Sequence, residues 1–144
     1  MKDDTGQILM NWFHFQLPSG RVIKVFDDYP FDLRNYVKKY VNILLFSGSY
    51  TLHDDNRNID KSKIFEGTFE KTFQLPLEWK DAYWGMENSY QIYREEHNIL
   101  SIRDGVIILD ETEKRLEKAG VKEGDKIVID FGGILLISWY PIDE

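Results

Sequence analysis

The sequence predicts a mainly β fold of the α+β class, with a small barrel-like N-terminal part and a C-terminal unit of two strands, a helix and two strands. Two glycine turns support the C-terminal unit, because Asp104-Gly105 and Gly132-Gly133 each separate two aliphatic runs and suit the positive φ angles of tight turns. In the N-terminal part, residues 65–73 alternate between apolar and polar side chains, which is the period of a half-buried strand. The predicted boundary lies after residue 96, giving segments 1–96 and 97–144, which can also pack as one domain.

In the N-terminal segment, residues 8–16 and 21–26 predict a hairpin, since Leu17-Pro18-Ser19-Gly20 is a turn signal. A short helix capped by Asp32 is expected next. The run 41–46 reads as a buried strand, which Ser47-Gly48-Ser49 is expected to turn back through residues 50–52. After the alternating strand, aromatic residues recur every three or four positions and predict a helix from about residue 77 to 94.

In the C-terminal segment, strands are predicted at 98–102 and 106–109. Asp110 and Glu113 have the spacing of a capping box, which predicts a helix from about residue 110 to 119 that ends at Gly120. The runs 126–131 and 134–139 predict the last two strands.

The passages 105–109, 116–120 and 121–127, followed by a glycine turn, resemble the AbrB/MazE-like swapped-hairpin domains. The resemblance covers about a third of the chain. It implies that two chains interleave into one barrel, which in that family commonly binds DNA. Arg103 is the single cation between Asn98 and Asp110, whereas the DNA-binding members present basic residues on this hairpin. The resemblance therefore supports the fold more than it supports DNA binding.

The composition is that of a folded protein, since 42% of the 144 residues are hydrophobic and 15% are aromatic. No apolar run approaches the ~20 residues of a membrane helix. The first residues lack the pattern of a secretory signal, so a cytoplasmic location is expected. The absence of cysteine excludes disulfides, thiolate metal sites and a cysteine nucleophile. The net charge of −7 argues against a protein that binds nucleic acid mainly through a cationic face.

One candidate for chemistry is His53-Asp54-Asp55, because an imidazole and two carboxylates can bind a metal or move protons. The asparagines and further aspartate that follow favour a solvated turn instead. The sequence contains no phosphate-binding glycine loop, zinc-helix motif or dinucleotide fingerprint. We therefore expect no cofactor and no catalytic residue.

The aromatic residues are the other candidates. Trp12, Trp84 and Trp139 are the side chains that a stacking platform or a protein interface would expose. Core packing explains most of the other aromatic residues, because they recur at inward-facing spacings.

Three functional hypotheses follow. The favoured one is a non-catalytic interaction protein that forms a homodimer through its C-terminal hairpins and also binds another protein. The second, which is not favoured, is a DNA-binding regulator in which Arg103, Lys114, Arg115 and Lys118 contact phosphate. The third and weakest is a metal-dependent enzyme that uses His53, Asp54 and Asp55.

Overall fold

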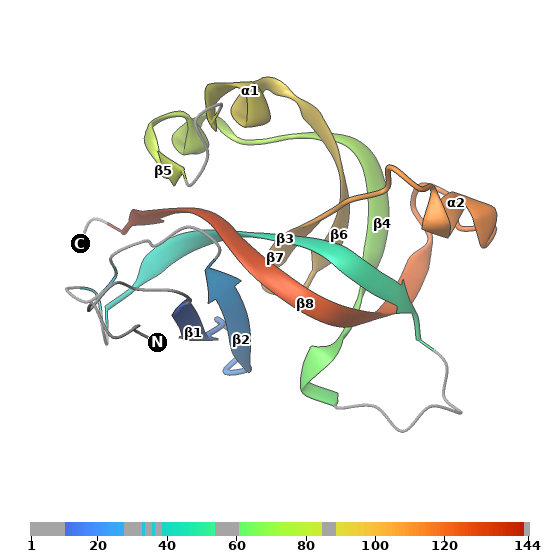
Figure 1. Cartoon of the computed structure of the whole chain (residues 1–144), viewed down its shortest axis with the longest axis horizontal. Helices are drawn as coiled ribbons and strands as arrows, with labels where there is room; N and C mark the ends of the chain where they lie inside the picture. The colour runs from blue at the N-terminus through green and yellow to red at the C-terminus, as the bar shows by residue number, and fades with distance from the viewer. Residues whose placement is uncertain are drawn as a thin grey trace, which may run out of the picture.

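The computed structural model describes residues 11–27, 33, 36, 39–53, 61–84 and 89–142 (Figure 1). These residues form a mainly β structure with two short α-helices. The elements in chain order are β1 (Asn11–Gln16), β2 (Val22–Asp27), β3 (Val41–Leu52), the 3-10 turn η2 (Lys61–Lys63), β4 (Ile64–Gln74), the 3-10 turn η3 (Leu77–Asp81), β5 (Tyr83–Trp84), α1 (Ser89–Arg94), β6 (Glu96–Ile102), β7 (Gly105–Leu109), α2 (Arg115–Lys118) and β8 (Lys126–Pro141). Within the described ranges, no helix has the length and apolar character needed to cross a bilayer.

The strands belong to one sheet in the order β1-β2-β8-β3-β7-β6-β4. Because β4 also pairs with β8, the strands β8, β3, β7, β6 and β4 close into a ring. The long strand β8 makes this closure, since its first residues pair with β4 and the rest of it pairs with β3. Figure 1 shows β8 crossing the molecule while β4 and β6 arc around the same space. Strands from both predicted segments, 1–96 and 97–144, are therefore interleaved in the ring, with β3 and β4 separated by strands of the C-terminal segment.

The ring encloses the main hydrophobic core, to which every ring strand contributes. Its fully buried members include Phe69, Leu100, Ile107 and Ile129, none more than 1% exposed. A smaller cluster lies on the other side of the sheet, where the segment around η3, β5 and α1 covers it; its buried members are Leu44, Leu75, Trp79, Ile99 and Ile108. The core of this fold is therefore built from side chains of both sequence segments.

Two of the predicted turns are wrong, and both lie in continuous strands. β3 runs through Ser47-Gly48-Ser49 with register shifts, and β8 runs through Gly132-Gly133 as one strand of 16 residues. The two motifs meet, because Ser49 pairs with Gly133 and the Ser47 hydroxyl donates to the Gly133 carbonyl oxygen at 2.6 Å. The small residues permit close approach and a local irregularity between two strands. The C-terminal unit consequently has one strand after its helix instead of two.

The two longest helix predictions are each right for only a short part of their length. The described part of the segment 77–94 forms η3, β5 and α1, because its aromatic side chains pack on the small core cluster and on one another, as in the edge contact between Trp79 and Trp84. Only Arg115–Lys118 of the segment 110–119 is helical. The Glu111 carboxylate, rather than Asp110, accepts from the Leu116 N–H group, while Asp110 accepts from Thr112. The expected helix near Asp32 lies largely outside the described residues.

Several strand predictions are confirmed, including the hairpin of β6 and β7 around Asp104-Gly105. The alternation in β4 is confirmed as far as Phe69, since Phe65 and Phe69 are buried in the main core. The pattern then breaks, because β4 gains one residue relative to β6 between Glu70 and Phe73. Thr72 has a positive φ of 56° at this bulge, and Phe73 packs on the small cluster instead.

Candidate functional site

Among the described residues, two parts of the sheet lie outside the ring, the two-residue strand β5 and the longer β1–β2 hairpin. The hairpin carries the candidate site. Its turn is stabilised by the Leu17 N–H group, which donates to the Arg21 carbonyl, and by Gly20, whose φ of 92° suits glycine. Its tip is attached to the ring by Asp104, whose carboxylate accepts from the Ser19 N–H group at 2.8 Å and from the Ser19 hydroxyl at 2.7 Å. The hairpin tip therefore rests against the turn between β6 and β7.

Arg21 forms a second attachment. Its guanidinium donates to the carbonyl oxygens of Ser62 and Ile64 at 2.9 and 2.6 Å, and lies 3.7 Å from the centre of the Phe65 ring. Burial lowers the pKa of Arg21, and the nearby carboxylate of Asp104 acts in the opposite direction. An arginine side chain stays charged in proteins in spite of such a shift. Arg21 therefore holds the start of β2 against η2 and β4 by charge-assisted hydrogen bonds.

Backbone pairing between the hairpin and the ring is limited to one position. β2 pairs with β8 in parallel at Phe26 and Leu135. The buried side chains of Leu17, Ile23 and Val25 supply the rest of the attachment, since they belong to the main core. The hairpin is thus attached at its tip and at the end of β2, with few backbone contacts between these points.

β1 is the terminal strand of the sheet, and in the described part of the chain it pairs with β2 alone. Its residues, Asn11 to Gln16, include no lysine, arginine, carboxylate or proline. Phe13 and Phe15 are half-buried against the main core, whereas His14 and Gln16 are exposed. We call the unpaired side of this strand the β1 edge. It offers backbone N–H and C=O groups without the charged side chains that protect most strand edges.

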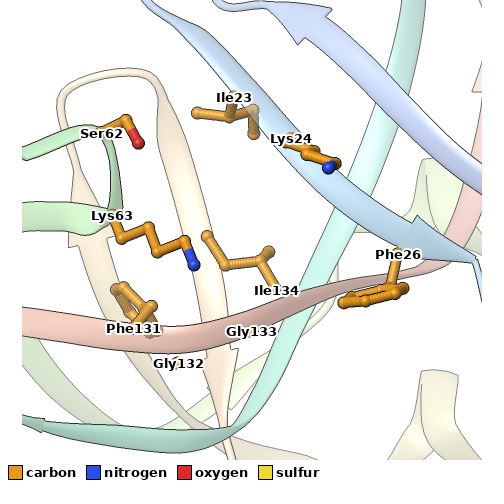
Figure 2. Close-up of a pocket in the computed structure, with 9 residues that line it drawn as sticks. All are labelled: Ile23, Lys24, Phe26, Ser62, Lys63, Phe131, Gly132, Gly133 and Ile134. Atoms are coloured by element: carbon orange, nitrogen blue, oxygen red, sulfur yellow. The ribbon is translucent and has the colours of Figure 1, made fainter. Parts of the chain in front are cut away.

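A pocket of about 270 Å³ lies where β2 separates from β8 (Figure 2). One wall comes from β2, the opposite wall from η2, and the floor from β8. The lining residues are Ile23, Lys24, Phe26, Ser62, Lys63, Phe131, Gly132, Gly133 and Ile134. Among the described residues, this lining combines the apolar side chains of β2 and β8 with two lysines, Lys24 and Lys63.

Of the predicted metal site, only His53 lies among the described residues. His53 Nδ1 lies 3.0 Å from Asp130 Oδ1, while Asp54 and Asp55 lie outside the described residues. Asp130 is 7% exposed and was missed by the sequence prediction, although it is the one charged residue inside the aliphatic run of β8 after Lys126. Among the described residues, no three histidine, aspartate or glutamate side chains are placed to hold a metal ion. Because Asp54 and Asp55 are not described, the metal-dependent hypothesis stays a prediction.

The predicted DNA-binding residues lie at the two ends of β7. Arg103 lies in the turn before β7, whereas Lys114, Arg115 and Lys118 lie at α2, beyond the other end of β7. Arg115 donates to the Gly48 carbonyl oxygen and its guanidinium lies 5.5 Å from the Tyr50 ring centre, so it attaches α2 to β3.

Tyr50 strengthens the same attachment. Its hydroxyl donates to the Glu111 carboxylate and to the Asp110 carbonyl oxygen. Burial raises the pKa of Tyr50, and the hydrogen bond to Glu111 raises it further. The neutral phenol is therefore favoured in the fold, and this cluster joins α2 to the ring.

Three tryptophans were predicted to lie at the surface, and for Trp139 this prediction is wrong. It is 5% exposed and packs in the main core, stacked against Tyr83 at 4.8 Å and in edge contact with Tyr36. Trp84 is half-buried and its indole N–H group donates to the Trp79 carbonyl oxygen. The Trp12 side chain lies outside the described parts of the structure. The positions of Trp84 and Trp139 therefore do not support a binding platform made by the three tryptophans.

Comparison with known proteins identifies no relative. No family model, no curated protein and no solved structure matches this chain.

Proposed function

We propose that this chain is a non-catalytic binding protein that works as a homodimer, and that two copies pair through the β1 edge. The observation that carries the proposal is that β1 ends the sheet, pairs on one side in the described part of the chain, and carries no charged residue. Unpaired edges of this kind pair readily with another strand, and natural proteins usually block them with lysine, proline or a bulge.

The sequence suggested a different route to the dimer, through the C-terminal hairpins. β8 follows Gly132-Gly133 without a turn and is paired with β4 or β3 along its length, so the β1 edge is the better candidate surface. Antiparallel pairing of β1 with the same strand of a second copy uses one surface twice, as a two-fold dimer requires. The exposed Val22, opposite Gln16 and 55% exposed, adds apolar area beside the edge.

The first experiment measures molecular mass in solution, by light scattering on a sizing column over a range of protein concentrations. We expect the mass of two chains, and we expect His14→Lys with Gln16→Lys to give the mass of one. Both side chains are exposed, and lysines on two facing copies of β1 repel each other.

Gln74→Lys is the matched control, because Gln74 is also an exposed glutamine at the last position of a strand, but β4 lies in the ring. We expect this variant to remain dimeric. A wild-type protein that stays monomeric at every concentration contradicts the proposal, and so does a double variant that is folded and still dimeric.

The DNA-binding alternative makes a separate prediction. If Arg103 and the cations of α2 contact phosphate, the protein is retained on immobilised duplex DNA at low salt and released as salt increases. We expect no retention, because the four cations lie at both ends of β7 and the chain carries a net charge of −7.

A further inference from the structure

We infer that Asp104 is a latent site of isoaspartate formation that Ser19 holds in check, and that conversion of Asp104 releases the tip of the β1–β2 hairpin. The site lies in the turn between β6 and β7. It is a site of chemical modification, separate from the β1 edge and independent of the proposed homodimer. Three features support it: the glycine after Asp104, the open space around that glycine, and the contacts of the Asp104 carboxylate.

The chain contains one Asp-Gly sequence, Asp104-Gly105. The backbone nitrogen of a glycine in this position can attack Cγ of the aspartate, because no Cβ shields the nitrogen. A bond forms between the nitrogen and Cγ, and water leaves with one carboxylate oxygen, which closes a five-membered succinimide ring.

The succinimide ring then opens by adding water. When the bond between the nitrogen and the former backbone carbonyl carbon breaks, the chain continues through Cγ, and that carbonyl becomes a free carboxylate. The product is isoaspartate. It has the same atoms as aspartate, so the sequence of steps requires no oxidant, reductant or co-reactant besides water.

Gly105 is accessible for this reaction. It is exposed, and outside its chain neighbours no heavy atom lies within 4 Å of the position that a Cβ would occupy. Its φ of 149° is strained for residues with a side chain, so the turn depends on glycine here. Ile102 pairs with Gly105 directly across the turn. The nitrogen that attacks therefore lies in a short, open turn.

The Asp104 carboxylate is engaged by Ser19, 85 residues earlier in the chain. One carboxylate oxygen accepts from the Ser19 N–H group at 2.8 Å, and the other accepts from the Ser19 hydroxyl at 2.7 Å. Succinimide formation requires the carboxyl group to turn toward the Gly105 nitrogen and to lose one of these oxygens. Hydrogen bonds to a charged group are stronger than neutral ones, so the contact with Ser19 opposes the reaction.

Conversion of Asp104 frees the hairpin tip in turn. Isoaspartate adds one atom to the backbone of the turn and moves the carboxylate from the end of the side chain to Cα. Ser19 then loses the acceptor that it contacts in the fold. The tip keeps its other attachments, which are the hydrogen bonds of Arg21 and the buried side chain of Leu17. The modification therefore loosens the tip without removing the hairpin from the core.

The first test ages the full chain at neutral pH and body temperature over several weeks. Isoaspartate is counted with an isoaspartyl O-methyltransferase and labelled S-adenosylmethionine, and mass spectrometry of peptides locates it. We expect slow formation at Asp104 in the wild type and formation about tenfold faster in Ser19→Ala, which removes the hydroxyl contact. The wild-type chain unfolded in guanidinium chloride should also react about tenfold faster than the folded chain.

Thr112→Ala is the matched control. The Asp110 carboxylate likewise accepts from a hydroxyl, that of Thr112, but Asp110 precedes Glu111 instead of glycine. We expect this variant to form no additional isoaspartate at Asp110 or at Asp104. Circular dichroism before ageing checks that both variants are folded.

The second test measures the release of the tip. The isoaspartyl form of the wild type is separated by ion-exchange chromatography, and its amide hydrogen exchange is followed by NMR. The N–H groups of Leu17 and Gly20 are hydrogen-bonded within the tip, and we expect both to exchange about tenfold faster in this form. The N–H group of Phe69, which donates to the Asp125 carbonyl oxygen in the ring, should exchange at an unchanged rate.

Equal rates in the folded wild type, Ser19→Ala and the unfolded chain overturn the protection by Ser19. Absence of isoaspartate at Asp104 in all three samples overturns the modification site. Unchanged exchange of Leu17 and Gly20 in the isoaspartyl form overturns the release of the tip. These outcomes are distinguishable from failure of the proposed homodimer, because the mass measurement uses variants of β1 and no aged protein.

Discussion

The ring and the β1–β2 hairpin differ in how their strands are held. Each ring strand has hydrogen-bonded neighbours on both sides, because β4 and β8 close the circle. Within the described ranges, the hairpin has an open edge on β1 and a single backbone pair between β2 and β8. The ring therefore stabilises the fold, whereas the hairpin leaves backbone groups of β1 to which another strand can pair.

The comparison also explains where the attachments of the hairpin lie. Ser19 and Arg21 fix its tip through hydrogen bonds, and Leu17 inserts into the main core. In the middle of β2, no described residue pairs with β8, and the pocket lies at that position. A region can thus be anchored firmly by side chains while its backbone remains available for other contacts.

The largest expected difference concerns the two phenylalanines Phe69 and Phe15. Phe69 is 1% exposed inside the ring, so we expect Phe69→Ala to lower the free energy of unfolding by about 3–5 kcal/mol. Phe15 is half-buried on the hairpin, and Phe15→Ala should cost less than half as much. Urea unfolding followed by tryptophan fluorescence measures both. Equal losses would remove the distinction between ring and hairpin.

The next largest difference in stability is expected between substitutions at two glycines, Gly67 and Gly133. A Cβ at Gly67 in β4 would collide with the backbone carbonyl of Ser101 on β6, so Gly67→Ala should destabilise the protein by about 1–3 kcal/mol. Gly133→Ala places its methyl group in open space at the pocket and should change stability by less than about 0.5 kcal/mol. Thermal unfolding of the two variants tests how tightly each region is packed. A destabilised Gly133→Ala variant would mean that the pocket is filled in the folded protein.

The smallest effect depends on pH. Tyr50→Phe removes the hydroxyl that bonds to Glu111 and to the Asp110 carbonyl, and we expect a loss of about 1–2 kcal/mol at pH 7. Because the fold raises the pKa of Tyr50, its stabilisation is complete below the unfolded value of about 10 and declines as pH rises above it.

The difference in unfolding free energy between wild type and Tyr50→Phe should therefore shrink between pH 9 and pH 11. Urea unfolding at several pH values in this range measures the difference. Tyr83→Phe is the control, because Tyr83 is 56% exposed. A difference that stays constant or grows would mean that the fold does not raise the pKa of Tyr50.

Local patterns in the sequence were sufficient to predict the strands that bury one face and expose the other. The alternation around Phe65 and Phe69, and the Asp104-Gly105 turn between β6 and β7, predict the observed elements because polarity and turn chemistry act between near neighbours. The class, mainly β, follows from these signals. The DNA-binding and dimer hypotheses, by contrast, remain predictions that depend on surfaces.

Where the prediction failed, a distant contact decided the structure. Gly132-Gly133 and Ser47-Gly48-Ser49 are turn signals by composition, yet they pair with each other across β3 and β8, 86 residues apart at Ser47 and Gly133. The capping role went from Asp110 to Glu111 for a similar reason, because Glu111 also accepts from Tyr50 on β3.

The sequence by itself determined the apolar alternation, the Asp104-Gly105 turn and the acidic, cysteine-free character of this protein, since these depend on residue type and near neighbours. Only the tertiary structure decided that the strands close into a ring and that β1 lies at the end of the sheet. Those features depend on pairing between residues far apart in the chain, which periodicity and turn composition do not specify.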